Sequence, residues 1–264
     1  MMDRLIPLEG TKKWQMHRDP ASDNVVVSRY PLARCSSERV TPIPRISPGL
    51  HLGFIGCLID LPDDAGPLDV YVVATHFTSG GGGRVRERQK HADTIVRHLR
   101  DLRKGGDLPQ ATPAVILGDL NVYAQEPKDP AHHLTTLLTG NIVDNSTFGD
   151  DTELDWDGSY MAEVKPRHNG SGKQWYTWRS DNSRYPPSAL DRIIYTDSVM
   201  KTVHSFVLNT TTMSKEHLSQ SGLLQEDVLQ NPSIPGEFDH LPLVADFTFR
   251  LEEIAKLRSS LKTE

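Results

Sequence analysis

The sequence predicts a single α/β domain, because short β-branched strands alternate with a few helices along its 264 residues, and one of these helices is clearly amphipathic. That helix is expected at about 84–103, where apolar residues recur every three or four positions and charged residues fill the others. It ends before Gly105-Gly106, a pair that stops helices. A second, modest helix is expected at 131–138. No sequence repeat and no clear linker divides the chain.

Strands are expected where a short apolar run is bounded by turn residues. Residues 69–75 (DVYVVAT) are rich in β-branched side chains, and 113–117 (PAVIL) are apolar throughout, as in a strand that is buried on both faces. Further strands are expected at 25–27 (buried), 51–61, 192–195, 203–208 and 243–249. Residues 145–184 are polar and turn-rich, which predicts a long surface excursion with short strands around Trp175–Trp178.

Charge and cysteine content narrow the class of protein. The hydrophobic fraction of 37% is typical of a lean globular domain. The formal net charge of −6 makes the chain a poor non-specific binder of nucleic acid, without excluding a local basic patch. Cys57 lies in an apolar run and is interpreted as a small buried hydrophobe, while one bridge to Cys35 is left open.

Targeting signals are not evident in the sequence. No apolar run approaches the roughly 20 residues that a membrane span needs. The start at Met1 is not followed by the apolar core of a signal peptide. A cytoplasmic protein and a natural N-terminus upstream of Met1 therefore both stay open.

Polar side chains follow two of the expected strands. Asp119 and Asn121 leave the strand at 113–117, and their spacing of two places both on one face of an extended chain. A carboxylate and a carboxamide that point together suit a hard cation and a phosphate oxygen. An ordinary turn explains this segment about equally well. His76 ends the strand at 69–75 in the same way, although a lone histidine there is more often a capped strand end.

Two further motifs carry acids and a histidine. Asp239 and His240 open the last strand, and Pro242 disfavours regular pairing there, so both side chains can reach one cleft. Aspartate beside histidine suits metal binding and proton transfer, although a surface turn is the alternative. Asp191 enters an apolar strand, which is costly unless the acid is paired. We expect a histidine partner, against the alternative of an edge pair with Arg192.

The order of these motifs resembles the endonuclease/exonuclease/phosphatase superfamily. His76 within THF, GDLN at 118–121, LDRIIY at 190–195 and DHLP at 239–242 each lie at a strand terminus. Residues 24–31 (NVVVSRYP) and Arg88-Gln89 are similar to further family features. The resemblance spans about residues 14–249, nearly the whole chain.

The resemblance implies a four-layer α/β sandwich, in which two packed and mostly antiparallel β-sheets are flanked by helices. It implies hydrolysis of phosphate esters with Mg²⁺ or Mn²⁺. By position, Asp119 is expected to place the attacking water near the metal, and Asp239 to be a metal-side carboxylate. Asn121 and His76 are expected to bind phosphate oxygens. His240 is expected to be the acid/base or transition-state histidine, oriented by Asp191.

One departure from the family concerns the metal. The family's first strand ends in Asn, and its second ends in a Gln-Glu pair whose Glu is the principal metal ligand. Neither motif is found before Asn24, and Pro7 makes Glu9 a loop or helix-end residue. We therefore expect a domain at 1–250 that lacks the family's first β-α-β segment, with an exposed sheet edge and an incomplete metal site. A charged, helix-compatible tail follows at 251–264.

Two classes of function remain open. The first is a metal-dependent phosphodiesterase or nuclease-like enzyme, which the six polar site residues favour. The second is a non-catalytic relative or an inactive fragment that binds a phosphorylated ligand, which the missing Glu favours. Neither a membrane span nor an obligate protein partner is evident.

The substrate is left open among nucleic acid, a phospholipid headgroup and an inositol phosphate. A nuclease would need a basic groove, and a basic run on the long helix would serve, although a solvated face is the usual reading. A lipid phosphodiesterase would need an exposed aromatic loop, for which three aromatic residues are available, although a Trp-rich strand is more often core. The basic run is Arg84, Arg86, Arg88 and Lys90, and the aromatic residues are Trp175, Tyr176 and Trp178.

Overall fold

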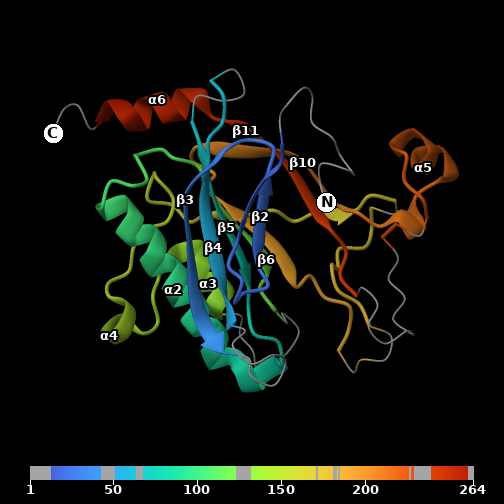
Figure 1. Cartoon of the computed structure of the whole chain (residues 1–264), viewed down its shortest axis with the longest axis horizontal. Helices are drawn as coiled ribbons and strands as arrows, with labels where there is room; N and C mark the ends of the chain where they lie inside the picture. The colour runs from blue at the N-terminus through green and yellow to red at the C-terminus, as the bar shows by residue number, and fades with distance from the viewer. Residues whose placement is uncertain are drawn as a thin grey trace.

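Six strands form the main sheet, in the order β3-β4-β5-β6-β9-β7. Figure 1 labels the strands β3, β4, β5 and β6 of this sheet. The β5–β6 pair is parallel and its other pairs are antiparallel. The strands are β3 (Leu32–Pro42), β4 (His51–Ile59), β5 (Val70–His76), β6 (Ala114–Asp119), β9 (Asp191–Tyr195) and β7 (Ala162–Glu163). The computed structural model describes residues 13–42, 51–63, 68–122, 132–170, 172–180, 183, 185–225, 227–228 and 239–260. Glu9 lies outside these residues.

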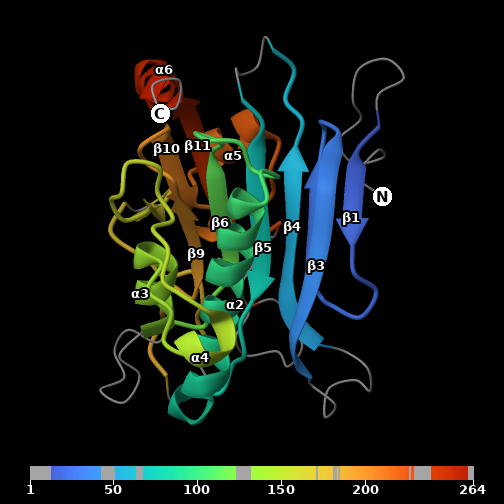
Figure 2. The same cartoon turned by 90° about the vertical axis from the view of Figure 1, so that its left-hand side faces the viewer.

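Helices cover one face of the main sheet, and Figure 2 shows α2 running along it. The apolar stripe predicted for α2 packs on side chains of β5 and β6, among them Ile95 and Leu99 against Val73 and Ile116. The helical elements here are η1 (Gly81–Arg84), α2 (Val85–Lys104), α3 (His132–Thr139) and α4 (Asn145–Phe148). The prediction of a surface excursion at 145–184 is partly wrong, because Phe148, Leu154 and Met161 are buried in this core.

The opposite face of the main sheet carries a second layer of strands. A three-stranded sheet, in the order β11-β10-β8, packs on the β6–β9 part through Val115, Ile193, Met200 and the partly buried Phe247. These strands are β8 (Arg167–His168), β10 (Met200–Val207) and β11 (Leu243–Phe249). Among the described residues, β11 pairs with β10 alone. The remaining helical elements are η2 (Thr210–Thr212), α5 (Lys215–Ser221) and α6 (Leu251–Ser260).

A hairpin of β1 (Gln15–Arg18) and β2 (Val25–Ser28) covers the β4–β5 part of that face through Val26, Ile55 and Ala74. The prediction of a buried strand here is wrong, because Val25 and Val27 are 43% and 37% exposed. One side of a two-stranded ribbon faces solvent, so its side chains alternate. With packed, mostly antiparallel sheets and outer helices, the structure has the predicted α/β sandwich class.

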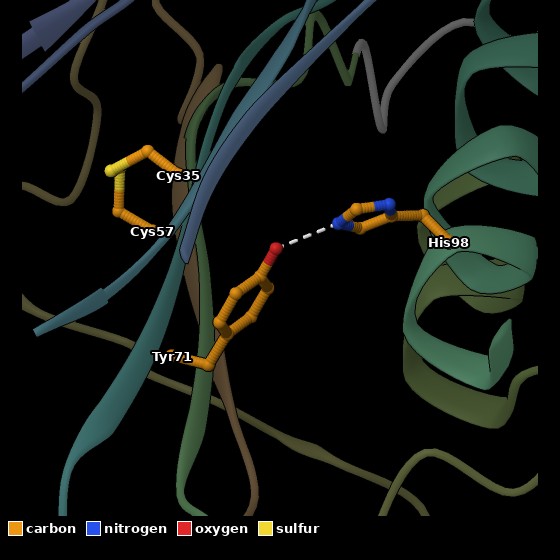
Figure 3. Close-up of a disulfide and its surroundings, with 4 residues drawn as sticks. All are labelled: Cys35, Cys57, Tyr71 and His98. Atoms are coloured by element: carbon orange, nitrogen blue, oxygen red, sulfur yellow. Dashed lines mark hydrogen bonds between the residues drawn. A yellow bond between two sulfur atoms is a disulfide. The ribbon is translucent and has the colours of Figure 1, made fainter. Parts of the chain in front are cut away.

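The two cysteines form a disulfide that joins β3 and β4 (Figure 3). Cys57 is fully buried, but the interpretation of it as a simple buried hydrophobe is wrong. The disulfide faces the β1–β2 layer. On the other side of the sheet Tyr71 points toward α2, where its hydroxyl lies 2.7 Å from Nε2 of His98.

Two other expectations are settled by the described residues. The segment Trp175–Trp178 forms no strand, because Trp178 makes only isolated bridges with Ser188 and His240. Within the part of the chain that the structure describes, no helix is long and apolar enough to cross a bilayer.

Candidate active site

Three neighbouring strands bring predicted site residues into one row. His76 is the register partner of Asp119 on β6, and Asp119 is the partner of Asp191 on β9. Register partners point to the same face of a sheet, so the three side chains lie side by side. Nε2 of His76 is 3.5 Å from Oδ2 of Asp119.

The turn after β6 holds Asp119 in place. A Cβ on Gly118 would lie 1.8 Å from the carbonyl oxygen of Thr75, so a side chain at this position would collide with β5. Asn121 has a left-handed φ of 49°, and its backbone N–H donates to Oδ1 of Asp119 over 2.8 Å. The side chains of Asp119 and Asn121 therefore meet through a turn, because β6 ends at Asp119 and the predicted extended chain does not continue.

Asn121 is almost fully buried, with 2% of its surface exposed. Its side-chain amide donates to the carbonyl of Phe77 over 2.9 Å and to Oδ2 of Asp119 over 3.0 Å. The amide thus fixes Asp119 against the chain that follows His76.

Residues 177–179, here called the strap, connect the approach to β9 with the approach to β11. The hydroxyl of Thr177 accepts the backbone N–H groups of Leu190 and Asp191 over 3.1 and 3.0 Å. On its other side, the carbonyl of Thr177 accepts the N–H of Leu241 over 2.7 Å. The strap therefore fixes the two chain segments that carry Asp191 and His240.

Trp178 extends this connection to Asp239. Its indole Nε1 donates to Oδ2 of Asp239 over 2.7 Å, and the backbone N–H of Arg179 donates to the Asp239 carbonyl over 3.2 Å. Sequence analysis missed Thr177 and Trp178 as supporting residues. The Thr-Trp pair sits in a polar segment without strand periodicity, so no pattern in the sequence linked it to the site.

His240 pairs with Asp191, as the sequence predicts. Nδ1 of His240 donates to Oδ2 of Asp191 over 2.8 Å. Arg192 pairs with Glu163 instead, so the alternative Asp191–Arg192 edge pair is not formed. Nε2 of His240 lies 4.0 Å from Oδ2 of Asp119 and 3.9 Å from Oδ1 of Asp239.

His76 has an aspartate partner that sequence analysis missed. Nδ1 of His76 lies 2.5 Å from Oδ2 of Asp23, in the loop between β1 and β2. Asn24 anchors that loop, because its amide donates to the carbonyl of Gly53 over 3.1 Å. The sequence offered one signal, an acid directly before the family-like segment at 24–31. The six predicted residues and Asp23 therefore gather in one place, with the Nε2 atoms of two histidines near one oxygen of Asp119.

The electrostatics of the site are dominated by acids. Burial lowers the pKa of His76, but Asp23 and Asp119 outweigh burial and raise it above its ordinary value. Burial likewise lowers the pKa of His240, and Asp191, Asp119 and Asp239 raise it overall. Burial and the charge of Asp191 raise the pKa of Asp119 against the opposing effect of the two histidines.

The acids fit a hard divalent cation in part. Asp119 and Asp239 offer carboxylate oxygens within about 4 Å of the same His240 nitrogen. Mg²⁺ is commonly held by one or two carboxylates together with waters. Within the described ranges, however, no three His, Cys, Asp or Glu side chains group as a metal site. The donor chemistry therefore suits Mg²⁺ or Mn²⁺, with few protein ligands.

Two residues of the basic run at the start of α2 have partners within the protein. Arg88 is fully buried, and its guanidinium donates to the carbonyl of Thr78 over 3.2 Å. Arg84 pairs with Glu87 over 2.8 Å. Arg88 therefore supports the chain that follows His76, whereas Arg86 and Lys90 are exposed.

Comparisons with solved structures give several distant likenesses. The human Nocturnin catalytic domain with bound sulfate is 16% identical, with a TM-score of 0.45, over 83% of this chain and 60% of that one. An endonuclease/exonuclease/phosphatase from Beutenbergia cavernae is 18% identical, with a TM-score of 0.47, over 85% of this chain and 47% of that one. Humanized D. rerio TDP2 is 12% identical, with a TM-score of 0.48, over 89% of this chain and 76% of that one. At these values the likenesses carry no argument about activity.

A family model carries the assignment. No curated protein matches the chain. The model of the Endonuclease/Exonuclease/phosphatase family matches residues 8–212, which is more than half of the sequence. That range contains four of the predicted site residues, His76, Asp119, Asn121 and Asp191, and also Asp23, which the sequence analysis missed. Asp239 and His240 follow it. The chain belongs to the endonuclease/exonuclease/phosphatase family.

Proposed function

We propose that this domain hydrolyses a phosphodiester with water and a divalent cation. Members of its family are generally phosphoester hydrolases. The observation that carries the proposal is the convergence of two histidine–aspartate pairs on Asp119, with His76 Nε2 at 3.5 Å and His240 Nε2 at 4.0 Å from its Oδ2.

The contacts of each residue support a proposed role. In this proposal Asp119 orients the attacking water and takes its proton. His240, held by Asp191, gives a proton from Nε2 to the leaving oxygen as the P–O bond breaks. His76, held by Asp23, donates from Nε2 to a phosphoryl oxygen. Asn121 is a positioning residue for Asp119, since its amide already donates to Asp119 and Phe77.

Asp119 and Asp239 are the proposed holders of Mg²⁺ or Mn²⁺. The bound cation would neutralise charge on the phosphoryl oxygens and lower the pKa of bound water. Because the expected Glu ligand was not found in the sequence, we propose that this chain binds Mg²⁺ weakly. Calorimetric titration of Mg²⁺ tests this, and tight binding would show that another residue supplies the ligand.

Hydrolysis of bis-para-nitrophenyl phosphate tests the proposed activity. We expect turnover in Mg²⁺ and loss of turnover in EDTA, and Asp119→Asn should lower turnover by about 100- to 1,000-fold. Asp246→Asn is the matched control, because that aspartate is 67% exposed on β11. Equal activity in EDTA and Mg²⁺ would overturn the metal-dependent mechanism.

A non-catalytic ligand-binding role is the alternative, favoured by the lack of a three-residue metal group among the described side chains. Binding of inorganic phosphate in Mg²⁺ without any turnover of the ester would support that role instead.

A further inference from the structure

A cavity of about 320 Å³ lies directly beside the Asp191–His240 pair. It lies where the chain leaves β7, just past the hydrogen bond from the N–H of Val164 to the carbonyl of Ile193 on β9. Its lining includes Lys165, Arg167, Trp175, Thr177, Asp191 and Arg192. Thr177 and Asp191 also belong to the candidate active site, so the cavity adjoins that site through these two residues.

The lining of the cavity carries a net positive charge, although the whole chain has a net charge of −6. Arg192 is balanced by Glu163, and Asp191 by His240. Lys165 and Arg167 add two positive charges, and Arg167 keeps its charge while donating to the carbonyl of Lys173 over 3.0 Å. The local charge therefore favours an anion.

Trp175 adds a flat apolar surface to this charge. Trp175 is 39% exposed, whereas Trp178 in the strap is only 9% exposed and donates a hydrogen bond to Asp239. An exposed indole beside cations suits a ligand that is both planar and anionic, because nucleobases stack on aromatic rings. The same cations would repel a quaternary ammonium headgroup.

We propose that this cavity binds the nucleotide portion of the substrate, with its base on Trp175 and a phosphate at Lys165 and Arg167. This inference rests on the proposed phosphodiesterase function and names its substrate class as a small nucleotide ester. The volume lies at the lower end of the range for small-molecule sites, about 300–1,000 Å³, which suits one nucleotide and not a long strand.

Binding of adenosine 5′-monophosphate to the full chain in EDTA tests the cavity without turnover. By calorimetry, we expect this nucleotide to bind about tenfold more tightly than inorganic phosphate or phosphocholine. Trp175→Ala should remove that preference and leave phosphate binding unchanged. The double variant Lys165→Ala/Arg167→Ala should weaken nucleotide binding by a further factor of about ten.

The matched controls are an exposed aromatic residue and an exposed cation that do not line the cavity. Tyr160→Ala removes an aromatic side chain that is 66% exposed, and Lys201→Ala removes an exposed cation on β10, so both should bind the nucleotide as the wild type does. Equal affinity for nucleotide and phosphate would overturn the inference, and so would tighter binding of phosphocholine, which points to a lipid headgroup. Nucleotide binding by a protein that does not cleave the ester would refute the proposed hydrolysis alone.

Discussion

The two halves of the candidate active site are built in different ways. His76, Asp119 and Asp191 stand at the ends of neighbouring strands whose register partners fix their spacing. Asp239 and His240 precede β11 and depend on a few hydrogen bonds from the strap. The side chain of Asp239 is 48% exposed, against 17% for Asp119. We refer to these as the sheet half and the strap half.

This difference assigns distinct properties to the halves. A continuous ladder of backbone hydrogen bonds resists local opening, whereas a segment that is held by a few isolated hydrogen bonds opens more easily. We infer that the sheet half sets a rigid geometry and that the strap half adjusts as substrate and cation bind.

The largest expected effect comes from breaking the pair that joins the halves. His240→Ala and Asp191→Asn should each lower turnover of the ester by about 100- to 1,000-fold, because one loses the proton donor and the other loses its orientation. The double variant should cost little more than the worse single variant, since residues that act as a unit are not additive. Fully additive losses, measured as kcat, would show that the two residues act separately.

A smaller effect is expected from the strap alone. Trp178→Phe keeps the ring but removes the indole donor to Asp239. A hydrogen bond to a charged group contributes about 1.5–3 kcal/mol, so the Mg²⁺ concentration for half-maximal turnover should rise about tenfold or more.

Trp156→Phe is the control for that experiment. It removes the indole donor to the carbonyl of Thr112, in the core between the sheets. It should lower thermal stability without changing the Mg²⁺ requirement. An unchanged requirement in Trp178→Phe would show that Asp239 needs no support from the strap.

The smallest effect concerns the stability of the six-stranded sheet in acid. Burial, with the nearby charge of Arg97, lowers the pKa of His98 from 6.5 to about 4 against the opposing charge of Asp101. Between these values the unfolded state binds more protons, so the free energy of unfolding falls as pH drops from 6.5 to 4, by up to about 1 kcal/mol per pH unit.

His98→Gln should flatten this pH slope in denaturant titrations. The matched control is His204→Gln on β10, where the histidine side chain is 75% exposed, and the slope should remain. Equal slopes in the wild type and His98→Gln would assign the acid sensitivity to other groups, of which His91, with a pKa lowered to about 3, is the first to test.

Prediction from sequence succeeded where structure is periodic. The strands that carry His76, Asp119 and Asp191, and the helix α2, follow from hydrophobic patterns. The histidine partner of Asp191 followed from the cost of burying an unpaired acid and from the family resemblance. The contacts of the strap and of Asp23 were not predicted, because they join residues far apart in the chain. Trp178 and Asp239 are 61 positions apart, and Asp23 and His76 are 53 positions apart. The exposed face of β2 was missed because three consecutive valines hide the alternation.

The disulfide has a consequence for where the protein works. The bridge joins the chain's two cysteines, and one of them is fully buried beneath β2. Disulfides persist in oxidising surroundings, whereas thioredoxin and glutathione keep cytosolic thiols reduced. The bridge closes a loop with a sequence separation of 22, and such a link typically stabilises a fold by about 2–4 kcal/mol. The protein should therefore reach its full stability only outside reducing compartments.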